Sequence, residues 1–482
     1  MPLTGAALWS VEMAGCLRSA IFLVLHGELL RIPILKGRNR TIQNHGAILS
    51  EGLLNQRSKG NSPDQAPKKV LVIGGGIAGL TAAWELARLD LDVKLIEKSS
   101  FLGGHAIQFC CKAADECQKC GACLVEKRLL EVIEEPRIKV YLKSEIEKMN
   151  RNSRFSYTLS QRSLYIDSQR CTNCGLCFEK CPADGAVIRG YSKNNVPLYA
   201  IDETHCPHFK DGSCRLCEDL CPEKAINLDP EPDRVSGEAD AIVVASGFQT
   251  FDPVNRPRYG YGINKNLITA LDLERMLREK GEVLRPSDDK VPEKIAFIQC
   301  VGSRDHKLQH GFCSQVCCGY AMRMAEAIHY RHPGAEVTIF YMDIQNCGKN
   351  FSKFYERCKD HIRFVRFMPG DIFQGEQDQL ILCYGDEKDG HSVREPFDLV
   401  VLSVGIMPGP SNASLADMLK LDLDEHGFFA FADPLDSTST SQQGVFLAGT
   451  AQGPKDIADT MAQAGQAAQR VAHYLGVMPC PK

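Results

Sequence analysis

Short apolar runs alternate with helical patterns along much of the chain. Apolar runs of strand length predict buried strands over residues 69–73, 93–97, 240–247, 295–299 and 444–449. Apolar positions at helical spacing predict helices over residues 80–88, 319–329 and 456–475. Strands that alternate with helices in this way indicate an α/β fold built on parallel sheets.

A glycine-rich turn joins the first predicted strand to the first predicted helix. Gly74 permits the tight turn, Gly76 lets the backbone approach a pyrophosphate, and Gly79 lets the helix pack close to the strand. The helix N-terminus then faces the anion. The second strand ends in Glu97, where an acid suits a contact to a ribose hydroxyl. These features together predict a dinucleotide-binding domain.

The residues after the second strand favour FAD over NAD. Lys98 follows the strand, and Gly103 and Gly104 come shortly after it. This Glu-Lys-x4-Gly-Gly pattern resembles the FAD-binding half of flavoproteins that have two dinucleotide domains.

The far end of the chain also favours FAD. The strand at 444–449 ends in Gly449, and a helix follows from Asp456, as in the closing motif of those flavoproteins. In that motif a backbone turn and a helix start meet the flavin side of the cofactor. The usual Asp after Ala-Gly is Thr450 here, so Asp456 is the candidate replacement.

Two cysteine runs between residues 163 and 230 form an internal repeat. Their Cys-x2-Cys-x3-Cys-Pro endings are typical of bacterial ferredoxins, in which the last cysteine of each run crosses to the other 4Fe-4S cluster. We therefore expect one cluster at Cys171, Cys174, Cys177 and Cys221, and a second at Cys206, Cys214, Cys217 and Cys181. Zinc is the alternative for four thiolates, and the Cys-Pro endings and the duplication argue against it.

A third cysteine group lies between the FAD fingerprint and the repeat. A further cluster there would use Cys117, Cys120, Cys123 and one of the adjacent pair Cys110 and Cys111, for which we take Cys111. A redox pair or buried thiols are the alternatives.

A fourth group follows the strand at 295–299, where a second nucleotide domain would carry its glycine-rich turn. That fingerprint is missing, and its position is occupied by Cys300, Cys313, Cys317 and Cys318. We therefore expect a cluster in place of NAD(P)H, so that the flavin exchanges electrons through clusters. Buried structural thiols are the alternative.

The amino-acid composition indicates a cellular compartment and argues against some functions. The 482 residues include 22 cysteines in tight clusters beside a nucleotide fingerprint, which indicates metal binding in a reducing, cytoplasmic setting. A net charge of −4 gives no reason to expect nucleic acid. No apolar run reaches the ~18 residues that span a membrane. The run at 19–25 faintly resembles a signal sequence, but we favour a poorly ordered extension or a start codon placed too far upstream, because fragile clusters are normally assembled in the cytoplasm.

The combined expectation is an α/β flavoprotein with two dinucleotide-binding domains, Rossmann-like and disulfide-reductase-like, and an inserted α+β two-cluster ferredoxin domain. We place an extension and linker at 1–67, FAD-domain segments at 68–162, 231–290 and 401–482, the ferredoxin insert at 163–230, and a degenerate second nucleotide-type domain with a cluster at 291–400.

Four stretches, together with these motifs, resemble the A-type subunits of heterodisulfide reductase and their short bacterial relatives. They are residues 300–305, 313–318, 341–344 and 451–457, and the resemblance covers about residues 68–476. It implies a 4Fe-4S cluster at the cysteines of the fourth group, near the flavin. It also implies that FAD is the branch point for electrons, which some members of the family bifurcate.

The chain departs from the family in two respects. Long members carry an N-terminal iron–sulfur domain and a C-terminal ferredoxin domain, neither of which we expect here. A lysine near the flavin in the family corresponds to Arg323, the one candidate catalytic residue. Arg323 keeps a positive charge that could stabilise reduced flavin, but it cannot release a proton. A plain surface or helix-pairing role is the alternative.

The resemblance predicts an oxidoreductase component of a larger complex. Its expected partners are B- and C-like heterodisulfide reductase subunits and hydrogenase-, formate- or NADH-linked modules, and a homodimer is compatible with the sequence. Two other functions compete with this one. The first is a self-contained NAD(P)H:acceptor oxidoreductase, and the second is a non-catalytic electron-transfer module of quinone or sulfur metabolism.

Overall fold

A computed structural model describes residues 21–25, 28–32, 67–230, 233–345, 348–386 and 389–478. The N-terminal unit, up to Ser62, is represented by an antiparallel hairpin of β1 (Ile21–Leu25) and β2 (Glu28–Ile32). Most of the extension and linker that we predicted at 1–67 lies outside the described residues, as does part of the signal-like run.

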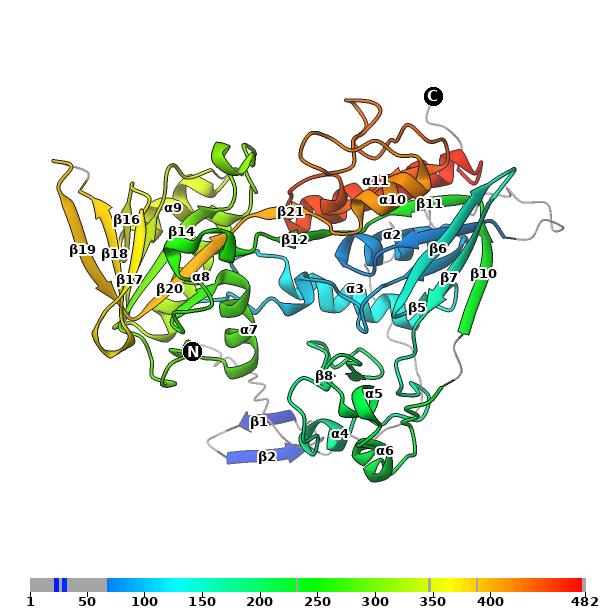
Figure 1. Ribbon diagram of the computed structural model, residues 1–482, viewed down its shortest axis with the longest axis horizontal. Coiled ribbons are helices and arrows are strands. Elements are labelled where there is room, and N and C mark those ends of the chain that lie inside the picture. Colours follow the sequence, from blue (N-terminus) through cyan, green and yellow to red (C-terminus); the bar gives the residue numbers. More distant parts are fainter. Residues whose placement is uncertain are drawn as a thin grey trace, which may run out of the picture. The chain divides into compact units, whose positions relative to one another are not determined.

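A parallel sheet with the strand order β22-β11-β3-β4-β5 forms the FAD-type domain. Its strands are β3 (Lys69–Ile73), β4 (Asp92–Ile96), β5 (Ile138–Tyr141), β11 (Ala241–Val244) and β22 (Val445–Leu447). Two of these strands, β5 and β11, are labelled in Figure 1. All four residues of β11 are buried, as expected for a strand covered on both faces. The predicted strands at 69–73, 93–97, 240–247 and 444–449 are thereby confirmed.

Helices cover this sheet because they turn apolar faces rich in small residues toward it. α2 (Ile77–Ala87) packs against α11 (Ile457–Tyr474), and α3 (Ala122–Glu134) packs beside α2. α10 (Asn412–Leu419) contributes to the core on the other face. An antiparallel sheet of β6 (Ser144–Arg151), β7 (Phe155–Gln161) and β10 (Asp233–Ala239) adjoins the domain. The helices predicted at 80–88 and 456–475 are confirmed.

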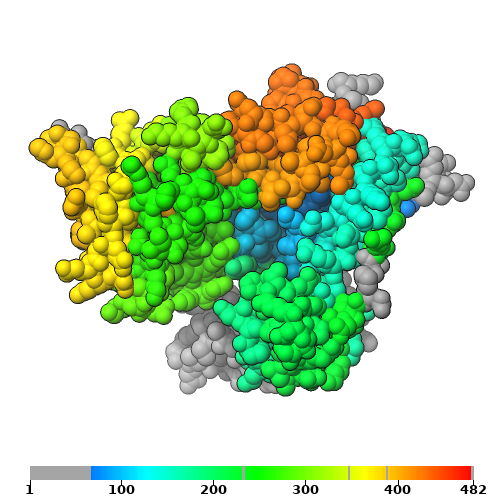
Figure 2. Space-filling model, in the orientation of Figure 1, coloured from blue at the N-terminus to red at the C-terminus, as the bar shows by residue number. Residues whose placement is uncertain are grey.

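The cysteine repeat between β7 and β10 forms a small α+β unit. Short helices and a two-stranded ladder make it up: α4 (Leu176–Glu179), β8 (Val187–Arg189), β9 (Tyr199–Ile201), α5 (Pro207–Asp211) and α6 (Leu216–Leu220). Its own core contains Ile166, Val187, Ile201 and Ile226. The space-filling view shows its residues gathered in one lobe (Figure 2).

A second parallel sheet has the order β13-β20-β14-β15-β16. Its strands are β13 (Leu267–Thr269), β14 (Lys294–Val301), β15 (Glu336–Phe340), β16 (Ile362–Val365) and β20 (Leu399–Val404). The associated helices are α7 (Ala270–Lys280), α8 (Cys317–Arg331) and α9 (Phe351–Lys359). A meander of β17 (Asp371–Gln374), β18 (Leu380–Gly385) and β19 (Ser392–Phe397) adjoins it. The strand predicted at 295–299 and the helix predicted at 319–329 are confirmed.

Two antiparallel strands, β12 (Phe248–Thr250) and β21 (Ile406–Pro408), carry the chain between the two parallel sheets. After β12 the chain enters the second sheet early, since β13 pairs with β20 and the capping box of Thr269 starts α7 there. Residues 267–280 therefore lie with the second sheet, whereas we had grouped 231–290 with the FAD domain. The reason is that β13 has three residues and gives a weak signal in the sequence.

A buried ion pair ties α7 to the segment that follows the FAD fingerprint. Lys112 Nζ lies 2.5 Å from Glu274 Oε1, with the two side chains 2% and 6% exposed. Glu274 also accepts a hydrogen bond from the Cys110 backbone N–H at 2.9 Å. Removal of one member would leave the other charge buried and unpaired, which is costly.

We therefore expect Glu274→Ala to lower the free energy of unfolding by about 3–5 kcal/mol, measured by chemical denaturation. The matched control is Lys280→Ala on the same helix. Lys280 pairs with Asp289 at 3.0 Å, but the side chains are 51% and 75% exposed, so its loss should cost less than about 1 kcal/mol. Equal effects of the two substitutions would contradict the assigned role of burial.

Candidate functional site

The carboxyl ends of β3 and β11 frame a crevice at the point where the strand order of the first sheet reverses. Open α/β sheets bind their ligands at such a point. Gly74 has φ +108°, and a Cβ there would lie 2.2 Å from the Ala245 carbonyl oxygen. A Cβ at Gly79 would lie 1.8 Å from the Gly74 carbonyl oxygen. Both positions therefore require glycine, and the turn is held close to β11 and to α2.

Gly76 leaves space in front of the helix. A Cβ added to Gly76 would meet only the Gly104 Cα, at 4.0 Å. Gly104 has φ +58°, a left-handed conformation that favours glycine. Gly76 is also the N-cap of α2 and has no side-chain cap, so no side chain competes there for the N–H groups of the first turn. The structure thus brings the glycine-rich turn and the later Gly103–Gly104 pair together, since the Gly103 N–H donates to the Gly75 carbonyl at 2.8 Å. This open, donor-lined cradle fits a diphosphate.

Glu97 directly follows β4 and lies beside this cradle, one residue beyond the end of the strand, which the sequence predicted to include it. One carboxylate oxygen accepts from Gly75 N–H at 2.6 Å, and the other accepts from Ser99 N–H at 2.7 Å. Each oxygen keeps further acceptor capacity, so a ribose hydroxyl remains an allowed partner. Lys98 instead reaches Ser411, with Nζ donating to Oγ at 3.1 Å.

The closing turn after β22 is short and strongly bonded. It consists of a 3-10 turn, η6 (Gly449–Ala451), and the residues that lead into α11. Asp456 is the N-cap of α11, and its carboxylate accepts from Asp459 N–H at 2.8 Å. Its cofactor-binding role stays a prediction. Lys455 lies in the family-like stretch 451–457 but was not singled out as a site residue, and its ammonium binds three oxygens of this turn.

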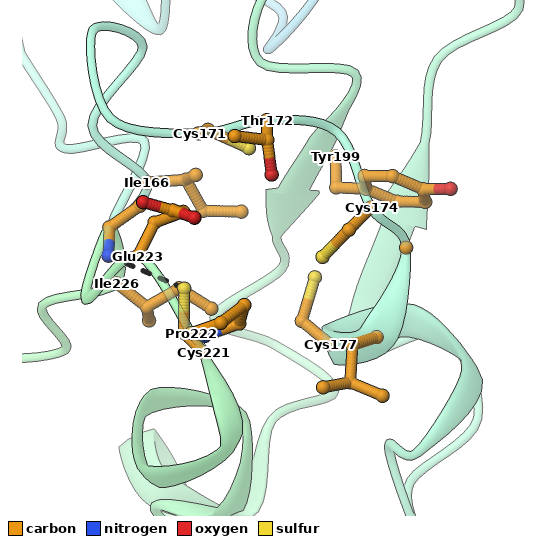
Figure 3. A pocket seen from close by; sticks show the side chains of 13 residues that line it. Ile166, Cys171, Thr172, Cys174, Cys177, Tyr199, Cys221, Pro222, Glu223 and Ile226 are labelled. Carbon is orange, nitrogen blue, oxygen red and sulfur yellow. Dashed lines mark hydrogen bonds between the residues drawn. The ribbon is translucent and has the colours of Figure 1, made fainter.

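Four cysteines of the insert surround one pocket (Figure 3). They are Cys171, Cys174 and Cys177 of the first run and Cys221, the last cysteine of the second run. Burial raises the pKa of Cys171, and the nearby Cys221 and Cys174 thiols add to the shift. The pocket thus collects the set that the crossover rule predicts for one cubane.

Cys217 lies near two of the other cysteines of the insert, Cys206 and Cys181, and the place of Cys214 in this set stays a prediction. Burial, and then the neighbouring Cys206 and Cys177 thiols, raise the pKa of Cys217 to about 12, with Cys181 adding to the shift. No three His, Cys, Asp or Glu side chains of the described residues converge as they would around one metal ion. The four thiols in Figure 3 instead line a shared space, which suits a cluster of several irons.

The second domain brings together the four cysteines that occupy the place of its nucleotide turn. Cys300 lies on β14, and α8 starts with Cys317 and Cys318. Burial and then the Cys318 thiol raise the pKa of Cys300 to about 11, and Cys313 contributes as well. Burial and then Cys300 also raise the pKa of Cys317. These effects place the thiols near one another, and their ligation of a common cluster stays a prediction.

An arginine beside these thiols was not singled out from the sequence. Burial dominates the pKa of Cys300, and the Arg304 guanidinium opposes that rise, which favours the thiolate that a metal requires. It forms a bidentate ion pair with Asp343, in which one Nη lies 3.0 Å from Oδ2. Two stretches of the family resemblance, 300–305 and 341–344, therefore meet at this pair.

The cysteine group before α3 lies against the second domain. Arg323 Nε donates to the Gln118 carbonyl at 3.1 Å, and Arg331 donates to the Cys111 carbonyl at 3.2 Å. Cys117 and Cys123 are exposed. No hydrogen bond among the described residues joins the thiols of Cys111, Cys117, Cys120 and Cys123 to one another, so this ligand set stays a prediction. Arg323 holds the loop backbone, and its role beside a flavin also stays a prediction.

Two family profiles match the chain. The NAD(P)-binding Rossmann-like domain matches residues 72–110, and the 4Fe-4S binding domain matches residues 164–185. They coincide with the glycine cradle and with the first cysteine run. With the cradle and the cysteine pocket, they make the chain a flavoprotein of the FAD type that binds iron–sulfur clusters. No helix in the described part of the chain combines the length and apolar character needed to cross a bilayer.

Two solved thioredoxin reductases superpose on most of the chain with low sequence identity. The Lactococcus lactis enzyme has a TM-score of 0.48 at 16% identity, over 85% of this chain and 100% of that one. The T. acidophilum enzyme has a TM-score of 0.47 at 15% identity, over 84% of this chain and 98% of that one.

Other proteins have a higher sequence identity to the chain than these two thioredoxin reductases. The chain is 37% identical over 428 residues to an iron–sulfur A-type subunit of the CoB–CoM heterodisulfide reductase of Methanopyrus kandleri. It is 36% identical over 424 residues to the A-type subunit of the H2:CoB-CoM heterodisulfide,ferredoxin reductase of Methanothermobacter marburgensis. Each alignment takes in 84% of this chain, which spans 64% and 63% of the lengths of these relatives. Over most of its length the chain is thus similar to the A-type subunits of heterodisulfide reductase.

Proposed function

We propose that this protein is the FAD- and 4Fe-4S-containing electron-transfer subunit of a heterodisulfide reductase-like redox complex. In this proposal FAD is the junction at which electrons from several clusters meet. Bound FAD supplies the conversion between one-electron and two-electron transfer, which clusters alone cannot perform.

One observation carries the proposal. The loop between β14 and α8 is where a second nucleotide domain binds NAD(P)H, and here it holds four mutually close cysteines, Cys300, Cys313, Cys317 and Cys318. Their thiols are partly or fully buried, and the Arg304 guanidinium opposes the effect of burial on the pKa of Cys300 and Cys318. A nicotinamide dinucleotide instead needs an open glycine-rich turn with free N–H groups. The donor set therefore favours a metal cluster at this position.

The proposed cofactors follow the cysteine groups. Two 4Fe-4S clusters belong to the insert, one with Cys171, Cys174, Cys177 and Cys221, and one with Cys181, Cys206, Cys214 and Cys217. A third belongs to the second domain. A fourth, at Cys111, Cys117, Cys120 and Cys123, would lie where Arg323 and Arg331 bind the loop backbone.

The proposed partners are other subunits of the complex. Several relatives are named as A-type subunits of reductases that use H2, formate or ferredoxin and a CoB–CoM heterodisulfide. By that analogy, we expect B- and C-like subunits to take electrons to a disulfide. We expect a hydrogenase-, formate- or NADH-linked module to supply them.

The choice of electron donor tests this function. The reconstituted protein, kept anaerobic, should show little bleaching of the flavin band with NADH or NADPH within seconds, whereas reduced methyl viologen should bleach it fully. Chemically, the expected difference arises because viologen delivers single electrons to clusters and a nicotinamide needs a hydride site. Rapid stoichiometric bleaching by either nicotinamide would favour the self-contained NAD(P)H oxidoreductase instead.

A further inference from the structure

Lys455 makes an unusual set of contacts in the turn that closes the FAD-type domain. Its ammonium donates to the carbonyl oxygens of Gly449, at 2.9 Å, and Gly453, at 2.8 Å, and to the Gln452 Oε1, at 3.1 Å. An ammonium has three protons, so neutral oxygens use all of its donors. The hydrogen bonds fix the turn, but none of them neutralises the charge.

The charge of Lys455 has no bonded counter-ion in the part of the chain that the structure describes. None of the salt bridges found there, up to 4.0 Å, includes Lys455. Burial lowers the pKa of Lys455 to about 8, and the more distant Asp459 opposes this shift. A partly buried cation without an anion is costly, so a nearby anionic ligand would be stabilised by it.

The strand order locates this cation relative to a bound dinucleotide. Glu97, the ribose acid, directly follows β4 on one side of the cradle, and the diphosphate position lies over the start of α2. A dinucleotide that places its adenosine toward β4 extends its other half toward β11 and β22. Lys455 follows β22. The turn also touches α2 directly, because a Cβ at Gly449 would lie 2.5 Å from the Ala78 Cβ.

From this geometry we infer that Lys455 is a positioning residue on the flavin side of the crevice, where its ammonium stabilises the reduced, anionic flavin. The inference rests on the proposed FAD site. Two electrons, supplied by a one-electron donor such as reduced viologen, and one proton convert bound FAD into a reduced form with one negative charge on its pyrimidine ring. The fixed ammonium favours that product over neutral oxidised FAD.

The test compares flavin reduction potentials of purified variants by spectroelectrochemistry at one pH. Lys455→Met and Lys455→Gln remove the charge, and Gln keeps hydrogen-bonding capacity. Lys455→Arg keeps the charge. The matched control is Lys139→Met, which removes an exposed lysine from β5, the strand at the opposite edge of the same sheet. FAD affinity of each apoprotein is measured by fluorescence alongside the potential.

We expect both uncharged variants to shift the equilibrium against reduced flavin at least about tenfold, while Lys455→Arg and Lys139→Met stay within about threefold of the parent. If the uncharged variants alone lose oxidised FAD, the charge serves cofactor binding and not the reduced flavin, which would overturn the inference. Unchanged potentials in the uncharged variants, or equal loss of FAD by all three Lys455 variants, would overturn it in favour of a purely structural turn. Failure of the parent protein to bind FAD would instead overturn the proposed function.

Discussion

Cys221→Ala should remove about four irons per chain and leave the second cluster of the insert in place. Cys221 belongs by sequence to the second cysteine run, but it lines the pocket of Cys171, Cys174 and Cys177 (Figure 3). A cubane that loses one of four thiolates loses its anchoring at that corner, so the whole cluster is expected to be lost or to become labile. Iron and sulfide analysis after anaerobic reconstitution measures the loss.

Double variants make this test specific for the crossover. Adding Cys171→Ala to Cys221→Ala should cost no further iron, because both thiolates would hold the same cluster. Adding Cys206→Ala should cost about four more. The control is Cys383→Ala on β18, an isolated, half-buried cysteine that should leave the iron content unchanged. If Cys171→Ala adds to the loss and Cys206→Ala does not, the ligand sets follow the runs and the crossover is wrong.

Local pattern was sufficient to predict much of this fold. The glycine turn, its flanking strand and helix, and Glu97 lie within 30 residues of one another, and their geometry follows from backbone conformation. The cysteine repeat could also be identified from the sequence, because cubane ligation imposes short, regular gaps between the cysteines. Even the pairing of Cys221 with the first run followed from the repeat, although the residues lie far apart in sequence.

Contacts between distant segments were not predictable in the same way. Arg304 pairs with Asp343, Lys112 with Glu274, and Arg323 with the Gln118 carbonyl, and each contact joins segments from different elements. No periodicity marks such partners, since they depend on how the two sheets and their loops pack. The role of Lys455 was not predictable for a related reason. A lysine before an aspartate N-cap has no distinctive sequence pattern, and only the folded turn brings three oxygens to its ammonium.

Arg323 makes a backbone contact that the sequence did not predict, while the role that the resemblance implies for it stays a prediction. The resemblance pointed to a cation near the flavin, and the structure shows its guanidinium on the backbone of the loop between Cys117 and Cys120. A planar guanidinium suits a fixed carbonyl contact of this kind better than proton exchange. The cation that we infer on the flavin side is Lys455, whose ammonium, unlike a guanidinium, can also release a proton.

Cys317→Ala should separate the flavin from its supply of electrons. The variant is expected to lose about four irons and to keep FAD and both clusters of the insert, because Cys317 lies in the second domain, outside the glycine cradle. Reduction of the flavin by reduced viologen, followed by rapid mixing, should slow at least about tenfold, since the path through the nearby cluster would be missing. Oxidised FAD binding should be unaffected.

Burial must be separated from ligation in this experiment, because Cys317 is buried and its loss leaves a small cavity. Cys358→Ala on α9 is the matched control, since Cys358 is fully buried in the same domain and was not predicted as a ligand. The Cys358→Ala substitution should lower the free energy of unfolding by a similar amount. It should leave the iron content and the rate of flavin reduction unchanged. If both variants keep full iron and full flavin reduction rates, the cysteines in the nucleotide-turn position are structural thiols, and electrons reach the flavin by another path.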